Sequence, residues 1–127
     1  MPSDAARSRL ITVRTSDGTT VCDRCVVADT ALRRLRGLLG RARLEPGEGL
    51  LIRPTHAIHM WFMRFSIDAV FIDEDGLVLR VAERLRPWRM AAKRGARCVV
   101  ELGAGECARH GLKAGDRLVM SATEAAS

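Results

Sequence analysis

Short runs of apolar and β-branched residues, separated by polar turn signals, recur along the whole chain. This pattern is typical of β-strands rather than of long helices. Two turn signals, Ser16-Asp17-Gly18 and Glu74-Asp75-Gly76, each lie between two such runs and predict β-hairpins. The runs predict strands over residues 9–14, 19–27, 50–53, 67–73, 77–81, 97–102 and 117–120.

Helical spacing is limited to two short segments. Asp29 offers a helix N-cap, and leucines recur at helical intervals until Gly40, which predicts a short helix over residues 29–40. A second short helix is expected within residues 103–110, ended by Gly111. Residues 56–65 read as extended, and residues 85–95 read as basic and irregular.

These elements predict a mainly β domain of the β-rich α+β type. We expect a compact antiparallel sandwich or barrel that carries one or two short helices. The 127 residues fit a single domain, 1–127, with frayed tails at residues 1–8 and 121–127.

The charge of the chain indicates that its partners could be anionic. The net charge is +6, and only Lys93 and Lys113 are lysines, so arginine carries nearly all of the positive charge. A cationic field attracts nucleic acid, anionic lipid or an acidic protein. Nucleic acid binding is not favoured at this point, because the sequence indicates no aromatic platform or known binding module. No apolar run is long enough for a membrane span or a secretory signal, so we expect a cytoplasmic protein.

Four cysteines, Cys22, Cys25, Cys98 and Cys107, raise the question of a thiol or metal site. Cys22-Asp23-Arg24-Cys25 has the C-x-x-C spacing that suits zinc or a redox dithiol. A second C-x-x-C is missing, and the pair falls on a β-prone segment instead of a helix N-terminus. We therefore expect buried or exposed ordinary thiols, no metal and no cofactor, with Cys22 and Cys25 as the weak metal candidates.

Several sequence blocks between residues 27 and 120 match a known pattern in order and spacing. They are Ala28-Asp29-Thr30, Arg36-Gly37-Leu38-Leu39-Gly40-Arg41, Gly49-Leu50-Leu51, residues 63–73, Asp75-Gly76 and residues 111–116. The chain resembles the bacterial family catalogued as domain of unknown function 192. The resemblance implies a compact, mostly antiparallel β fold with a short helix, and it implies no particular activity.

The candidate site residues lie in the best-matched blocks. Asp68 interrupts an apolar run, and a buried carboxylate there must be paired or hydrogen-bonded. Arg36 and Arg64 are natural bidentate partners. The favoured reading is a structural salt bridge or a turn-capping hydrogen bond; the functional reading is a cleft in which an arginine grips a polar or anionic ligand and Asp68 orients it.

His59 completes the candidate ligand-binding set of Arg36, Arg64, Asp68 and His59. His59 lies near Met60 and Met63, but methionine is more often a core filler than a metal ligand. We expect a small binding or accessory module for an unidentified polar or anionic ligand or a protein partner. The alternatives are a hydrolase-like enzyme at the same cleft, whose catalytic residues the sequence leaves unknown, and a metal or thiol site at Cys22 and Cys25.

Overall fold

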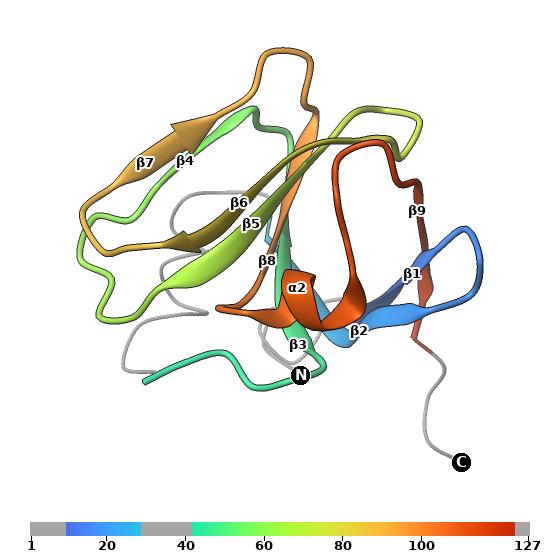
Figure 1. Cartoon of the computed structure of the whole chain (residues 1–127), viewed down its shortest axis with the longest axis horizontal. Helices are drawn as coiled ribbons and strands as arrows, with labels where there is room; N and C mark the ends of the chain where they lie inside the picture. The colour runs from blue at the N-terminus through green and yellow to red at the C-terminus, as the bar shows by residue number, and fades with distance from the viewer. Residues whose placement is uncertain (1–9, 29–41, 124–127) are drawn as a thin grey trace, which may run out of the picture.

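The computed structural model describes residues 10–28 and 42–123. A seven-stranded sheet with the strand order β6-β5-β8-β3-β2-β1-β9 and a separate two-stranded ribbon, β4-β7, account for all the strands of these residues (Figure 1). The bounds of the elements are β1 (Leu10–Thr15), β2 (Thr20–Ala28), β3 (Glu48–Ile52), β4 (Ala57–His59), β5 (Ile67–Ile72), β6 (Val78–Leu85), β7 (Met90–Ala92), β8 (Cys98–Gly103), α2 (Glu106–His110) and β9 (Leu118–Ala122). The mainly β prediction is confirmed.

One strand pair departs from the antiparallel expectation. Strands β2 and β3 are parallel, with Val26 opposite Leu50, while the other pairs are antiparallel. A parallel pair cannot be joined by a tight turn, because the chain must return to the starting end of the first strand. The long connection after Ala28 serves this purpose, and the helix predicted over residues 29–40 lies outside the described residues.

The sheet curls until its two outermost strands meet. Leu77 and Arg117 form an isolated antiparallel bridge beside the starts of β6 and β9. Two backbone hydrogen bonds support it, Val78 N–H to Asp116 C=O at 2.8 Å and Leu118 N–H to Gly76 C=O at 2.8 Å. Gly76 permits this approach, since a Cβ there would lie 2.4 Å from the carbonyl oxygen of Leu118. The sheet is therefore a partly closed barrel, one of the two predicted architectures.

The core has two parts, one on each face of the sheet. Ile67, Ala69 and Phe71 of β5 belong to one apolar cluster, and Val70 and Ile72 belong to the other. Every residue of β5 is buried, and all but Asp68 are apolar, so the strand does not alternate between apolar and polar residues. β5 is thus a central strand that is covered on both sides.

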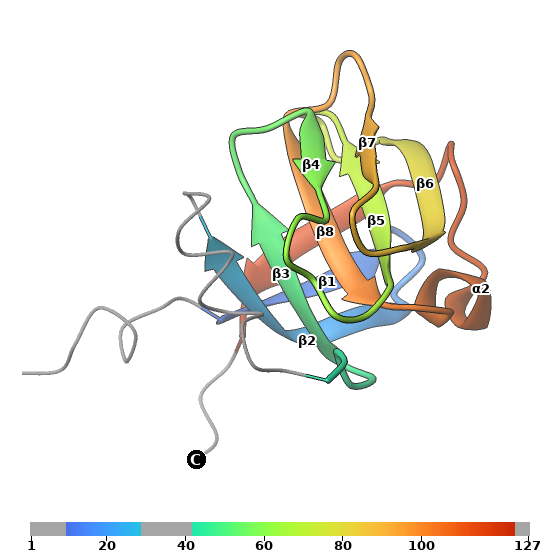
Figure 2. The same cartoon turned by 90° about the vertical axis from the view of Figure 1, so that its left-hand side faces the viewer.

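The ribbon β4-β7 covers one of these faces. Ile58, Met60 and Ala91 are buried in the same cluster as Phe71, and Figure 2 shows β4 and β7 in front of β8 and β5. Two expectations change here. Residues 85–95 are not wholly irregular, because they include β7, and residues 56–65 are not extended throughout, because the chain turns after Met60.

The C-terminal boundary also differs from the expected one. Strand β9 continues through Ala122, whereas residues 121–127 were expected to be a frayed tail. Ser121 pairs with Thr12, and Ala122 pairs with Ile11, so both residues belong to the sheet. The pairing with β1 is a long-range contact, so the local sequence around Ser121 does not predict that the strand continues.

Candidate functional site

Asp68 is fully buried and accepts three backbone hydrogen bonds. One carboxylate oxygen, Oδ1, accepts the N–H of Arg84 at 2.8 Å. The other, Oδ2, accepts the N–H of Gly105 at 3.1 Å and the N–H of Cys107 at 2.9 Å. Both oxygens are therefore occupied by the main chain.

These bonds explain why a carboxylate stands inside an apolar strand. They tie β5 to β6 and to the first turn of α2, whose first N–H groups have no helical acceptor of their own. Gly105 at the N-cap of α2 lacks a capping side chain, and Asp68 supplies one from a distant strand. This geometry favours the capping role for Asp68, one of the two structural roles that the sequence suggested, and its donors are backbone N–H groups instead of an arginine side chain.

The four candidate ligand-binding residues do not gather around Asp68. Arg64 and His59 are exposed to solvent, whereas Asp68 is buried beside α2, and Arg36 lies outside the described residues. His59 instead joins a group of aromatic side chains at the end of the ribbon. Arg64 lies two residues after Phe62, a member of the same group.

We call this group the aromatic surface, and define it as His59, Trp61, Phe62 and Trp88. The rings of His59 and Trp61 are stacked, with centroids 5.3 Å apart and planes 18° apart. The Trp61 and Trp88 centroids are 6.0 Å apart, and those of Phe62 and Trp88 are 5.1 Å apart. The four rings form one continuous row.

The aromatic surface is open to solvent. Phe62 is 70% exposed, Trp88 is 58% exposed and Trp61 is 38% exposed. Large apolar side chains that gather on a surface mark an interaction site more often than single exposed ones do. The sequence did not reveal this surface, because Phe62 and Trp88 are 26 residues apart and only the pairing of β4 with β7 brings them together.

Two tight turns hold Phe62 and Trp88 in place. In one, the N–H of Met63 bonds to the carbonyl of Met60 at 3.3 Å, and Phe62 has a φ of 66°. In the other, the N–H of Arg89 bonds to the carbonyl of Arg86 at 3.2 Å, and Trp88 has a φ of 67°. A positive φ at the third residue is the mark of a type II turn, where glycine is preferred. Each turn therefore holds an aromatic residue in a backbone conformation that costs free energy.

The same part of the chain concentrates the positive charge. Residues 54–66 and 84–100 form the ribbon, its turns and the start of β8, and they contain seven of the 21 Lys and Arg residues but none of the 15 Asp and Glu residues. The rest of the chain is close to neutral, although the whole chain carries +6. Arg64, Arg86 and Arg89 are exposed within three residues of an exposed ring. The aromatic surface consequently lies in a cationic field.

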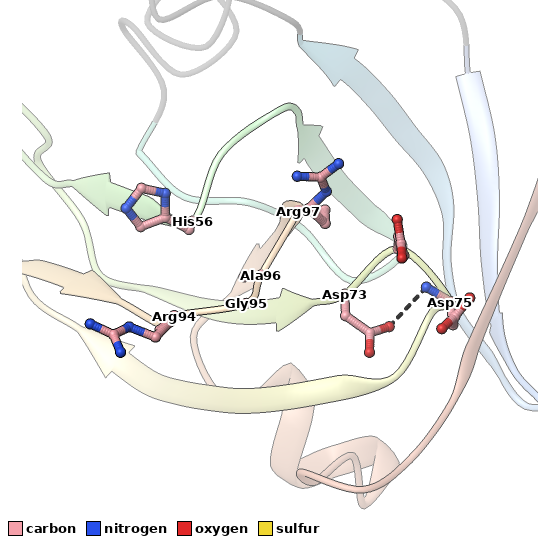
Figure 3. A pocket seen from close by; sticks show the side chains of 8 residues that line it. His56, Asp73, Asp75, Arg94, Gly95, Ala96 and Arg97 are labelled. Atoms are coloured by element: carbon pink, nitrogen blue, oxygen red, sulfur yellow. Dashed lines mark hydrogen bonds between the residues drawn. The ribbon is translucent and has the colours of Figure 1, made fainter.

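A surface cavity of about 750 Å³ lies near the other end of the ribbon (Figure 3). Figure 3 shows His56 and Arg94 on one side of it and Asp73 and Asp75 on the other. Oδ1 of Asp73 accepts the N–H groups of Asp75 and Leu77, both at 2.9 Å, so this carboxylate shapes the β5–β6 turn. The lining of the cavity holds three acids, Asp73, Glu74 and Asp75, against two arginines, Arg94 and Arg97, so positive charge is not concentrated there.

The cysteines lie mostly in the core. Cys22, Cys25 and Cys107 are buried, and Cys98 is partly buried. A hydrogen bond with the Cys22 thiol and burial both raise the pKa of Cys25, and burial raises the pKa of Cys107 and of Cys98. Raised values disfavour the thiolate that metal binding and redox chemistry need. No cluster of three or more metal-ligating side chains occurs within residues 10–28 and 42–123.

Glu101 of β8 is a second buried acid, and the sequence analysis did not identify it as a candidate residue. Its side chain is fully buried on the face of the sheet that the ribbon covers, opposite Leu50 of β3 and Ala69 of β5 in the strand register. The signal was a single glutamate inside the apolar run Cys98-Val99-Val100-Glu101-Leu102. It is the same signal that singled out Asp68.

The helix of the described chain is much too short to cross a lipid bilayer.

Two solved structures resemble this fold. One, from Sinorhizobium meliloti, is described as a "putative transcription regulator"; it has a TM-score of 0.72 and 29% identity, and the match covers 89% of this chain and 95% of that one. The other, a protein of unknown function from Novosphingobium aromaticivorans, has a TM-score of 0.68 and 26% identity, covering 86% and 82%.

Sequence relatives point to one family. A UPF0127 protein of Thermococcus sibiricus is 34% identical over 87 residues, which are 65% of this chain and 56% of that protein. Another UPF0127 protein, from Pyrococcus abyssi, is 35% identical over 82 residues, which are 59% of this chain and 67% of that protein. The match thus spans little more than half of the Thermococcus protein. The profile of the DUF192 family, described as "Uncharacterized ACR, COG1430", matches residues 12–120, and the chain belongs to this family.

Proposed function

We propose that this chain is a small binding module that recognises an anionic ligand through its aromatic surface. The observation that carries the proposal is the row of four exposed rings within a segment that has seven cations and no acid. Rings supply contact area at a low cost in side-chain entropy, and arginine supplies charge and planar hydrogen bonding.

The backbone geometry supports the same conclusion. Phe62 and Trp88 both adopt the left-handed conformation, although their rings remain exposed. Strained residues persist where the surrounding structure holds them, and they cluster at functional sites. A selection for stability alone would favour glycine at both positions.

The proposed ligand surface differs from the cleft that the sequence suggested. It keeps His59 and Arg64 and leaves Asp68 out, because the carboxylate of Asp68 is used by three backbone donors. The same occupancy argues against a hydrolase in which Asp68 acts on a substrate, so we propose binding without catalysis.

Intrinsic fluorescence gives a direct test, because the chain has only two tryptophans and both lie in the aromatic surface. Heparin oligosaccharide is the anionic probe. We expect its addition to change the tryptophan emission, and added salt to reverse the change.

A charge-matched pair of variants localises the effect. Arg89→Glu should weaken heparin binding. Arg14→Glu should not, because Arg14 lies in β1, three strands away from β8 in the sheet and outside the aromatic surface. Equal weakening by both substitutions, or no change in emission at any heparin concentration, would contradict the proposal.

A further inference from the structure

We infer that the anionic ligand of the aromatic surface is single-stranded nucleic acid. This inference rests on the proposed function and names the ligand class. The structure supplies the aromatic platform that the sequence did not indicate, and that missing platform was the reason to disfavour nucleic acid.

The shape of the row of rings is the first argument. Neighbouring centroids are 5.1 to 6.0 Å apart in the order His59–Trp61–Trp88–Phe62, and Phe62 and Trp88, at one end of the row, are more exposed than Trp61. A ring that is exposed can stack on a base, and every base offers a flat face for this contact. A polyanion without rings, such as an acidic peptide or a sulfated sugar, would use the charge but would leave these ring faces without a matching partner.

The position of the arginines is the second argument. Arg64 follows Phe62 by two residues, and Arg86 and Arg89 flank Trp88 in the opposite turn. In the sequence, Phe62 and Trp88 therefore each have a cation within two residues. Single-stranded nucleic acid repeats the same pairing, a base beside a phosphate, along its whole length.

The accessibility of the base faces distinguishes single-stranded from double-stranded nucleic acid. In a duplex the base faces are stacked on one another and are closed to side chains, so a duplex could offer only phosphates to this surface. The exposed row of rings thus favours a single strand over a duplex. Three arginines that contact phosphates would give binding a salt slope of roughly −2 on a log–log scale.

The test compares strands of equal phosphate number that carry bases or lack them. The probes are (dT)12, its RNA counterpart U12, and a 12-unit abasic oligonucleotide with the same phosphate backbone, each titrated against tryptophan emission. We expect (dT)12 and U12 to bind at least about tenfold more tightly than the abasic strand, because stacking on a side chain contributes about 1–3 kcal/mol per base.

Three variants separate stacking from charge. Trp88→Gly keeps the left-handed turn and leaves Trp61 as the fluorophore, and it should reduce (dT)12 affinity about tenfold without changing the affinity of the abasic strand. Arg89→Glu should weaken both. Val119→Ala is the matched control, since Val119 is an exposed apolar side chain on β9, and it should change neither. Far-ultraviolet circular dichroism checks that each variant is folded.

The outcomes distinguish the two proposals. If (dT)12 and the abasic strand bind equally, the nucleic acid inference is wrong while anion binding stands. If neither strand nor heparin binds, both are wrong. Tighter binding of a 12-base-pair duplex would overturn the single-strand inference, and tighter binding of a poly-glutamate peptide would replace nucleic acid with an acidic protein partner.

Discussion

Phe62 and Trp88 occupy equivalent positions in two turns at the same end of the ribbon, and their ring centroids are 5.1 Å apart. The two turns are linked through Met60, which is buried and bonds by its backbone to both Trp88 and Arg89, at 2.8 and 2.7 Å. The buried Met60 therefore fixes the geometry from which the exposed rings project.

The left-handed conformation of Phe62 predicts an unusual response to glycine. The variant Phe62→Gly should be more stable than Phe62→Ala by about 1 kcal/mol, because alanine keeps the cost of a positive φ and glycine does not. Urea unfolding measures both. Val119 lies in a strand, so there the order should reverse, with Val119→Gly less stable than Val119→Ala. Equal stabilities of the two Phe62 variants would show that φ at this residue is not strained.

Removing the carboxylate of Asp68 should destabilise the fold severely. Asp68→Ala leaves three backbone N–H groups, of which that of Cys107 is buried, without an acceptor, and we expect a loss of about 3–5 kcal/mol. Asp68→Asn keeps one acceptor oxygen and should lose less. Chemical unfolding, with Glu74→Ala as an exposed acidic control, checks the ranking. If Asp68→Ala were folded with unchanged stability, the structural role of Asp68 would be contradicted and a ligand-binding role would be favoured.

The thiols should differ in reactivity according to burial. With iodoacetamide at pH 8, Cys98 should be modified first, because it alone among the four is not fully buried. Cys25 and Cys107 should react only after unfolding, since their raised pKa values keep the thiolate scarce. Mass spectrometry of timed samples gives the order. Fast modification of Cys25 in the native protein would revive the thiol site.

The first turn of α2 should respond to acid. Hydrogen bonds from Arg109 to Glu106, at 2.8 and 2.9 Å, lower the pKa of the Glu106 carboxyl below its ordinary value of 4.5. A lowered carboxyl pKa in the folded state means that the stabilisation is present above pH 4.5 and is lost as the pH falls through the folded-state pKa. Glu106→Gln should therefore be less stable than the parent at pH 7, and the gap should close toward pH 3. A gap that stays constant over this range would exclude the ion pair as its cause.

The hairpins and the short helix were predictable because local signals encode them. The turn Glu74-Asp75-Gly76 and the C-cap Gly111 act within a few residues, and the structure places both as expected. The aromatic surface was not predictable, since it depends on the register of β4 against β7. For Asp68 the sequence left a salt bridge and a capping hydrogen bond open, because it shows that a buried carboxylate needs donors but does not show that a distant helix start will provide them.

The pairing of β1 with β9 also has a kinetic consequence. Ile11 lies opposite Ala122, so this pair joins positions that are 122 − 11 = 111 residues apart in the sequence. The bridge between Leu77 and Arg117 likewise depends on the residues that precede β9. Contacts of such large sequence separation slow folding, because a long loop must close before they form. A nascent chain can thus build its hairpins early, but the barrel can close only after the final strand has left the ribosome.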